Sequence, residues 1–226
     1  MNGRHELKHY INALDYAQLR TRLHVVAKPD GHTGESGGYE VRSLYFDNYT
    51  DKAVTEKMSG LGRREKFRLR YYDGDTSFIR LERKSKANRL AYKEQAAVTA
   101  GECTAILAGN FSCLLTDETL SEQALRMELY TKIRYQNLRP KSIVDYHREA
   151  YTYRAGNVRI TFDSNIRTSN SVAGFLDPGL VTIPAANVIV LEIKYDGFIP
   201  DIIRDILQIG SRNQTEFSKY VAARHV

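Results

Sequence analysis

The chain alternates basic and apolar side chains over residues 66–70, which read Lys66-Phe67-Arg68-Leu69-Arg70. Successive side chains of a β-strand point to opposite faces, so one face of this strand would carry cations and the other hydrocarbon. An ordinary antiparallel sheet with one face in water also alternates in this way. The polar faces of the other predicted strands therefore decide between a solvated face and a functional one.

The same alternation recurs along the chain. On each further predicted strand, the residues that share the charged face are Arg80, Glu82 and Lys84; Arg159, Thr161 and Asp163; Glu192 and Lys194; Tyr146 and Arg148; and Glu6 and Lys8. A solvated face usually mixes Thr, Ser, Gln and Glu, whereas these faces repeat Arg and Lys. The positive charges of such a face would repel one another in an open sheet. The pattern predicts an α+β fold whose strands form a closed antiparallel β-barrel, a tunnel with a charged interior and helices packed outside. About eight strands would suffice to enclose a ligand.

Periodicity and turn residues place the elements. The predicted strands are 4–11, 39–46, 65–72, 77–84, 90–98, 142–151, 157–163 and 187–195, and the predicted helices are 13–27, 100–108, 121–136, 201–209 and 215–224. Asn12 is suited to cap the first helix, and Thr99 with Glu102 has the spacing of a capping box. We expect residues 1–226 to form one domain.

The composition is that of a globular chain, with 42% hydrophobic and 27% charged residues. The net charge of +6 suggests an anionic partner, although many proteins with such a charge bind none. Apolar runs last only a few residues and the N-terminus lacks an apolar signal region, so we expect a soluble, cytoplasmic chain that does not insert into a membrane. A membrane-bound partner stays open. Cys103 and Cys113 lack metal-ligand spacing and are expected to be reduced thiols, with a disulfide less favoured.

The inward charges suit phosphoryl chemistry better than other chemistry. A triphosphate carries about four negative charges, which Arg forks, Lys ammonium groups and one metal ion can neutralise. A lone inward Glu192 would stay ionised and could hold a hard cation, or it could form an internal salt bridge to Lys194 or Arg159. Nucleic acid is not expected, because the basic residues point inward and no stacking aromatics accompany them in an RNA-binding motif.

Eight short motifs, in this order, resemble the VTC domain. They are His5-Glu6-Leu7-Lys8-His9-Tyr10, Ser43-Leu44-Tyr45-Phe46-Asp47, Lys66-Phe67-Arg68-Leu69-Arg70, Glu82-Arg83-Lys84, Tyr146-His147-Arg148, Arg159-Ile160-Thr161-Phe162-Asp163, Leu191-Glu192-Ile193-Lys194 and Phe217-Ser218-Lys219-Tyr220. That domain is the polyphosphate polymerase domain of the vacuolar transporter chaperone complex, within the triphosphate tunnel metalloenzyme (CYTH-like) superfamily. The resemblance covers residues 3 to 222.

The resemblance implies a metal-dependent polyphosphate polymerase that moves the γ-phosphate of ATP onto a polyphosphate chain, with Mn²⁺ or Mg²⁺ as cofactor. It implies catalytic roles for Arg68, Arg70, Arg148, Arg159 and Lys219, and substrate binding by Lys8, Lys84, Lys93, Tyr146 and Ser218. Lys66 and Lys194 join the substrate-binding set because they share the inward face. Glu192 matches the metal-binding glutamate of the family. The C-terminal helix is expected at the end of the tunnel.

The first strand departs from the superfamily pattern. Simple triphosphatases carry Glu-x-Glu-x-Lys there, whereas this chain reads Arg4-His5-Glu6-Leu7-Lys8. Arg4 thus replaces one metal-binding acid, which disfavours a generic triphosphatase. Two alternatives stay open beside the polymerase: hydrolysis of inorganic or nucleoside triphosphate, and binding of polyphosphate, or of another polyanion such as RNA, without turnover.

Overall fold

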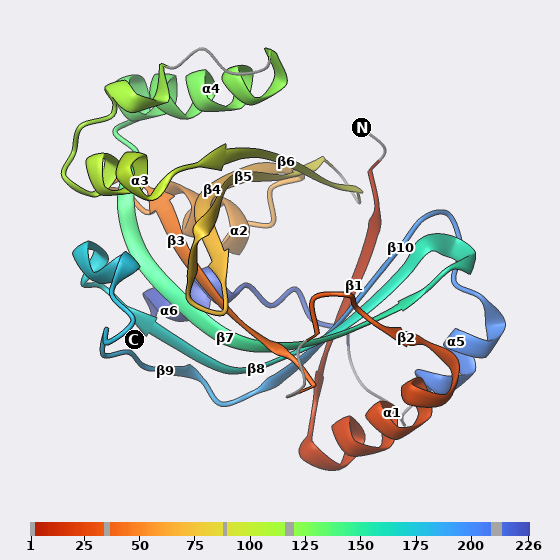
Figure 1. Cartoon of the computed structure of the whole chain (residues 1–226). Coiled ribbons are helices and arrows are strands. Elements are labelled where there is room, and N and C mark those ends of the chain that lie inside the picture. Colours follow the sequence, from red (N-terminus) through yellow and green to blue (C-terminus); the bar gives the residue numbers. More distant parts are fainter. Residues whose placement is uncertain (1–2, 34–36, 88–89, 116–119, 209–213) are drawn as a thin grey trace.

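The computed structural model describes residues 3–33, 37–87, 90–115, 120–208 and 214–226. Within these residues, one antiparallel sheet contains every strand, in the order β1-β10-β8-β7-β3-β4-β5-β6, with β2 beside β7 and β9 beside β8 (Figure 1). The strands are β1 (His5–Ile11), β2 (Lys28–Pro29), β3 (Tyr39–Asp47), β4 (Arg63–Tyr72), β5 (Asp75–Ala87), β6 (Leu90–Val98), β7 (Arg139–Tyr153), β8 (Val158–Ser169), β9 (Ile183–Ala186) and β10 (Ile189–Tyr195).

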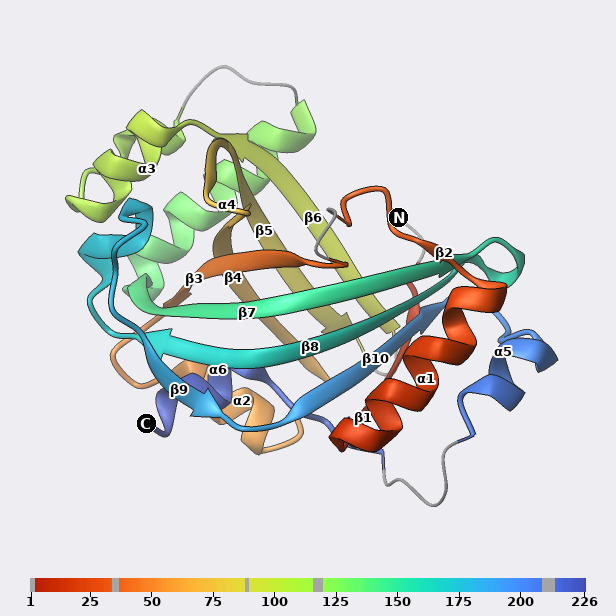
Figure 2. The same ribbon diagram turned by 60° about the horizontal axis from the view of Figure 1, so that its bottom comes forward.

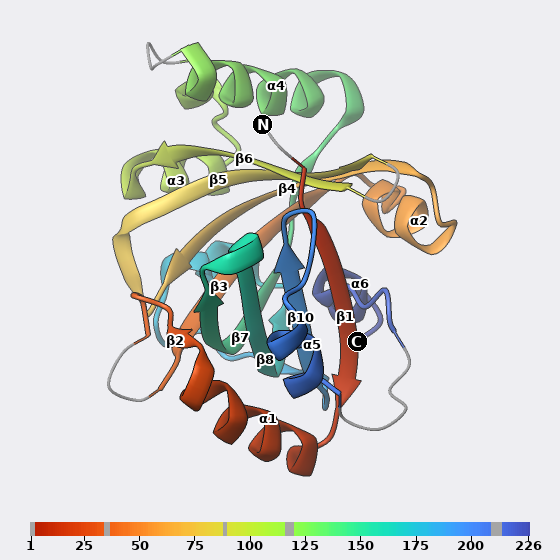
Figure 3. The same cartoon turned by 90° about the vertical axis from the view of Figure 1, so that its right-hand side faces the viewer.

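The sheet is not closed into a barrel, so the predicted closed barrel is wrong. The path of paired strands ends at β1 on one side and β6 on the other. Within the described residues, these edges meet at an isolated bridge between Arg4 and Ala91, with two backbone hydrogen bonds of 3.2 Å. Figure 3 shows β4, β5 and β6 lying across from β1, β10 and β8, so the sheet curls back on itself and has an inner and an outer face. Alternation fixes which side chains share a face, but the twist and the bulges of the strands decide whether the edges pair.

The helices of the described residues are α1 (Ala13–Val26), α2 (Lys52–Met58), α3 (Ala100–Leu107), α4 (Leu120–Gln136), α5 (Asp201–Ile206) and α6 (Lys219–Arg224). Four of them, α1, α3, α4 and α5, pack on the outer face (Figure 2). One apolar core joins α1 and α5 to the outward side chains of β8 and β10, and another joins α3 and α4 to those of β4, β5 and β6. Both predicted caps form: Asn12 makes a capping box with Asp15, and Thr99 makes one with Glu102. The helix predicted over 201–209 ends at Ile206, and residue 209 lies outside the described residues.

The C-terminal helix α6 packs on the inner face, at one end of the sheet. Tyr220 and Ala223 are buried there against inward side chains of β3, β7 and β10. The Tyr220 ring stacks on Tyr45 with 4.8 Å between centroids, and its hydroxyl donates to Asp47 at 2.9 Å. The inner face is therefore apolar beneath α6 and charged beyond it.

Two further expectations concern the setting of the chain. Cys103 and Cys113 are free thiols. Cys103 is buried in the outer core. No helix in the described part of the chain combines the length and the apolar character needed to cross a bilayer.

Candidate functional site

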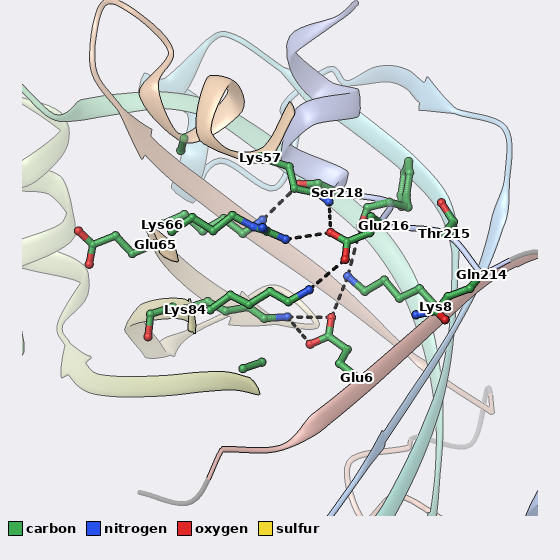
Figure 4. Close-up of a pocket in the computed structure, with 16 residues that line it drawn as sticks. Glu6, Lys8, Lys57, Glu65, Lys66, Lys84, Gln214, Thr215, Glu216 and Ser218 are labelled. Atoms are coloured by element: carbon green, nitrogen blue, oxygen red, sulfur yellow. Dashed lines mark hydrogen bonds and ion pairs between the residues drawn. The ribbon is translucent and has the colours of Figure 1, made fainter. Parts of the chain in front are cut away.

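Charged side chains gather on the inner face because each strand alternates inward and outward residues. Lys66 pairs across the ladder with Lys84, and Arg68 pairs with Glu82, so β4 and β5 carry adjacent rows of charge. Opposite them, Lys8 of β1 and Glu192 of β10 are ladder partners. Figure 4 shows Lys84 reaching toward Glu6 of β1 and Lys66 reaching toward Ser218. The inward-charge interpretation of the strands therefore holds, although the barrel does not close.

Glu192 is buried within a shell of cations. Its Oε1 lies 3.2 Å from Lys194 Nζ and 4.0 Å from Lys84 Nζ, and its Oε2 lies 3.7 Å from Arg148 Nη2. Burial alone would raise the pKa of Glu192, but these cations together with Lys8 hold it well below the usual range. The carboxylate is thus ionised. Of the two internal salt bridges considered from the sequence, the one to Lys194 forms.

A second carboxylate, Glu6, lies beside Glu192. Lys84 Nζ is 2.7 Å from Glu6 Oε2 and Lys8 Nζ is 2.9 Å from Glu6 Oε1, so Lys84 contacts both acids. Burial would raise the pKa of Glu6, but Lys84, Lys8 and Lys194 outweigh it and lower the pKa. The sequence had placed Glu6 on the inward face without a role in the site.

The donor set fits a divalent cation that is shared with a phosphate ligand. Glu192 Oε1 contacts the ammonium groups of Lys194 and Lys84, at 3.2 and 4.0 Å, and a carboxylate oxygen can accept more than one contact, so it has capacity for a further partner. Among the described residues, no group of three or more His, Cys, Asp or Glu could enclose a metal ion by itself. Mg²⁺ is commonly held by one or two carboxylates, with the remaining positions filled by phosphate oxygens and water. Glu192 and Glu6 match that arrangement.

The arginines of the site are oriented by partners on neighbouring strands. Arg148 donates to both carboxylate oxygens of Asp163, from Nε at 2.6 Å and from Nη2 at 2.8 Å, and Lys219 of α6 pairs with the same carboxylate. Arg68 donates to Glu82 at 2.7 Å and to the Tyr45 hydroxyl at 3.0 Å. Such bidentate and charge-assisted contacts fix the side chains before any ligand arrives.

Tyr146 and Ser218 contact the cations of the site directly. The Tyr146 hydroxyl accepts from Arg70 Nη2 at 2.9 Å, and the Lys219 ammonium lies 4.5 Å from the centre of the Tyr146 ring. Ser218 Oγ accepts from Lys66 Nζ at 3.2 Å. Both residues were predicted to bind substrate, and they position cations that face the same space.

Lys66 and Tyr45 report the excess of positive charge. Burial, and then the nearby ammonium groups of Lys84 and Lys8, lower the pKa of Lys66 to about 7. Burial would raise the pKa of Tyr45, but Arg68 and Lys66 outweigh it and lower the pKa to about 7. An anion placed among these cations would offset the repulsion that contributes to the lowered pKa of Lys66.

Two predicted residues lie at the margin of the cluster. Arg159 pairs with Asp30 at 2.5 Å and donates to the Tyr39 hydroxyl at 3.0 Å, and the salt bridge to Glu192 considered from the sequence does not form. Lys93 pairs with Glu82 at 2.6 Å, but its side chain is 48% exposed. The structure thus brings the other predicted cations closer together than these two.

The cations outnumber the acids that pair with them. Ten predicted site residues are Lys or Arg, and in the described part of the chain five carboxylates pair with them; these are Asp30, Glu6, Glu82, Asp163 and Glu192. The formal excess is five positive charges. The sequence had assigned no role to Glu82 and Asp163, yet both follow from the same alternation. Asp30 carries no such signal, because it lies outside the long strands.

The fold and the site define a class: a curled antiparallel sheet that gathers an excess of cations on its inner face. The chain belongs to the VTC domain family, whose profile matches residues 3–226. This confirms the resemblance to the VTC domain seen in the sequence motifs.

Solved structures with a similar fold include a Bacillus halodurans protein provisionally described as an adenylate cyclase. It shares 13% identity, with 92% of this chain and 87% of that chain covered and a TM-score of 0.50. The PH1819 protein of Pyrococcus horikoshii OT3 shares 14% identity over 91% of this chain and 84% of its own, at a TM-score of 0.41. At such identities the likeness concerns the fold alone, and a TM-score of 0.41 supports no further argument. No curated protein matches this chain.

Proposed function

We propose that this protein, acting as a single domain, is an ATP-dependent polyphosphate polymerase that transfers the γ-phosphate of ATP to a polyphosphate chain. The observation that supports this best is the formal excess of five positive charges among the predicted site residues and the acids that pair with them. The triphosphate of ATP carries about four negative charges, which this excess would neutralise. Membership of the VTC domain family supports the same class of substrate.

In the proposed step, a terminal oxygen of the polyphosphate attacks the γ-phosphorus of ATP. The bond from that phosphorus to the β–γ bridging oxygen breaks, and ADP leaves with the bonding electrons. Arg68, Arg148 and Lys219 are already held by Glu82 and Asp163, so they need little reorganisation to stabilise charge on the transferring oxygens. Positioning and charge neutralisation are the main contributions that this reaction needs from a protein.

Glu192 and Glu6 would hold the metal ion, Mn²⁺ or Mg²⁺. When bound, that ion supplies neutralisation of the phosphate oxygens that it contacts. Lys84 and Lys194 pair with these two carboxylates in this structure. With the acids engaged elsewhere, both ammonium groups would become available to the phosphates, which explains why acids and bases are interleaved.

The test is incubation of the purified protein with ATP and Mn²⁺ or Mg²⁺, with separate quantification of ADP, free phosphate and polyphosphate. We expect the amount of ADP released to equal the amount of phosphate incorporated into polyphosphate. Free phosphate equal to ADP, without polymer, would assign a triphosphatase instead. Tight polyphosphate binding without turnover would assign a binding module.

A pair of matched variants controls for general effects of charge. Arg148→Gln should abolish polymer formation, since Arg148 lies within the cation cluster and contacts Glu192. Arg204→Gln removes the same charge from the exposed surface of α5, where Arg204 pairs with Asp201 in an i,i+3 contact, and should retain activity. Equal activity of the two variants would contradict the proposed site.

A further inference from the structure

A second group of cations lies at the edge of the inner face, around the carboxylate of Glu216 (Figure 4). Arg64 Nη2 of β4 lies 2.9 Å from Glu216 Oε2, and Lys86 Nζ of β5 lies 3.0 Å from Oε1. Lys57 of α2 donates to Oε2 as well. One carboxylate thus faces three cations that come from three elements, and two positive charges stay uncompensated within the group.

Two of the three cations continue the row of the proposed catalytic site. Arg64 and Lys86 are ladder partners one inward step beyond Lys66 and Lys84. Inward side chains on a strand recur every two residues, or about 7 Å, so the row from Arg64 to Arg70 extends about 20 Å. Such an extended row of like charge matches a linear polyanion better than a compact one.

Glu216 is held in place by the segment that also lines the catalytic site. The Thr215 amide donates to the Lys8 carbonyl oxygen at 2.8 Å, and Lys8 Nζ donates to the Phe217 carbonyl oxygen at 3.2 Å. The side chain of Glu216 is nevertheless 59% exposed. Hydrogen bonds from Lys57 and Lys86 lower the pKa of Glu216 to about 2, so the carboxylate is ionised at neutral pH.

We propose that Lys57, Arg64 and Lys86 form an outer binding site for the distal phosphates of a polyphosphate chain, and that the Glu216 carboxylate occupies this site until the chain displaces it. This inference rests on the proposed function and adds the path of the chain. A triphosphate bound among the central cations leaves the Glu216 contacts intact, whereas a long chain replaces them. Affinity therefore depends on chain length, and Glu216 sets that dependence. The competing interpretation is that Glu216 only ties the C-terminal segment to β4 and β5.

The experiment measures dissociation constants of tripolyphosphate and of long-chain polyphosphate at matched ionic strength, without nucleotide. Glu216→Gln removes the competing carboxylate and keeps the shape of the side chain. We expect this variant to bind the long chain about tenfold more tightly, which corresponds to about 1.4 kcal/mol, and to bind tripolyphosphate within twofold of the wild type. Lys86→Gln should weaken binding of the long chain alone, which tests the site independently of Glu216.

The matched control is Glu128→Gln on α4, because Glu128 pairs with Arg83 and Lys132 away from the inner-face row. It should change neither affinity. Equal tightening of both anions by Glu216→Gln would indicate a general field effect and overturn the inference, as would unchanged binding of the long chain by both the Glu216 and the Lys86 variants. If the wild type binds tripolyphosphate and long-chain polyphosphate with equal affinity, the proposal of an outer site is wrong and the proposed function stands. If it binds neither anion, both fail.

Discussion

Glu82 offers the sharpest test of the charge arrangement on the inner face. Its side chain is 1% exposed, and its carboxylate lies 2.6 Å from Arg68 Nη2, 2.6 Å from Lys93 Nζ and 3.8 Å from Arg70 Nη1. Burial would raise the pKa of Glu82, but Arg68, Arg70 and Lys93 lower it well below the usual range. Glu82→Gln would leave Arg68 and Arg70 buried without their carboxylate. Removal of one partner from a buried ion pair costs about 3–5 kcal/mol.

The loss is measurable by thermal unfolding of the ligand-free protein. For a chain of this size, 1 kcal/mol shifts Tm by about 2–4 °C, so Glu82→Gln should lower Tm by roughly 6–20 °C. Lys93 adds little to this estimate, because its exposed ammonium is screened by water. The control is Asp201→Asn, which removes a charge from a side chain that is 84% exposed and should change stability by less than about 0.5 kcal/mol.

A phosphate ligand should compensate for the missing carboxylate. Tripolyphosphate at a hundredfold excess over its dissociation constant stabilises the folded state by about 2.7 kcal/mol. The gain in Tm at equal ligand concentration should be larger for Glu82→Gln than for the wild type, because the phosphate then meets cations that no acid neutralises. A variant as stable as the wild type, or one that gains less from tripolyphosphate, would refute the reasoning.

Three further predictions concern other parts of the site. Because the pKa values of Lys66 and Tyr45 are lowered, the folded chain binds fewer protons than the unfolded chain between pH 7 and 10. The free energy of unfolding, measured by urea titration, should therefore rise with pH by up to about 1.4 kcal/mol per pH unit for each group. Lys66→Met should reduce that rise. Glu192→Gln should lose metal-dependent turnover yet still bind tripolyphosphate without metal in calorimetry, and loss of both would show that Glu192 maintains the fold. Tyr220→Phe should lower the free energy of unfolding by about 1 kcal/mol, because Asp47 loses a buried hydrogen bond; an unchanged value would mean that water replaces it.

The faces of the strands could be predicted from the sequence because alternation is a local property. Lys66, Arg68 and Arg70 share the inner face as expected, and Phe67 and Leu69 lie in the outer core. The caps at the starts of α1 and α3 are equally local, since each needs two residues at fixed spacing. Closure is different, because it depends on how β1 and β6 meet after the whole sheet has twisted. No pattern within either strand records that outcome.

The partners of the cations were harder to predict than the cations themselves. Glu82 and Asp163 lie in the alternating pattern, so their inward position was visible, but their pairing with particular arginines depends on the register between strands. Asp30 and Glu216 come from segments without periodicity, and their approach to Arg159 and Lys86 is set by the path of the chain between elements. Sequence reasoning therefore identifies the cationic half of the site and leaves much of its acidic half unassigned.

The internal acids explain why the sheet can stay open. The closed barrel was expected because a basic open face would repel itself. In the structure, however, Glu82 pairs with Arg68, Asp163 with Arg148, and Glu6 with Lys84. Each pairing removes repulsion locally, so the empty protein does not need closure to be stable. The remaining excess of positive charge is small enough for the protein to stay folded without a ligand and large enough to favour binding of a polyanion. The ion pair of Glu6 with Lys84 also links β1 to β5 near the edge where the ladder is interrupted.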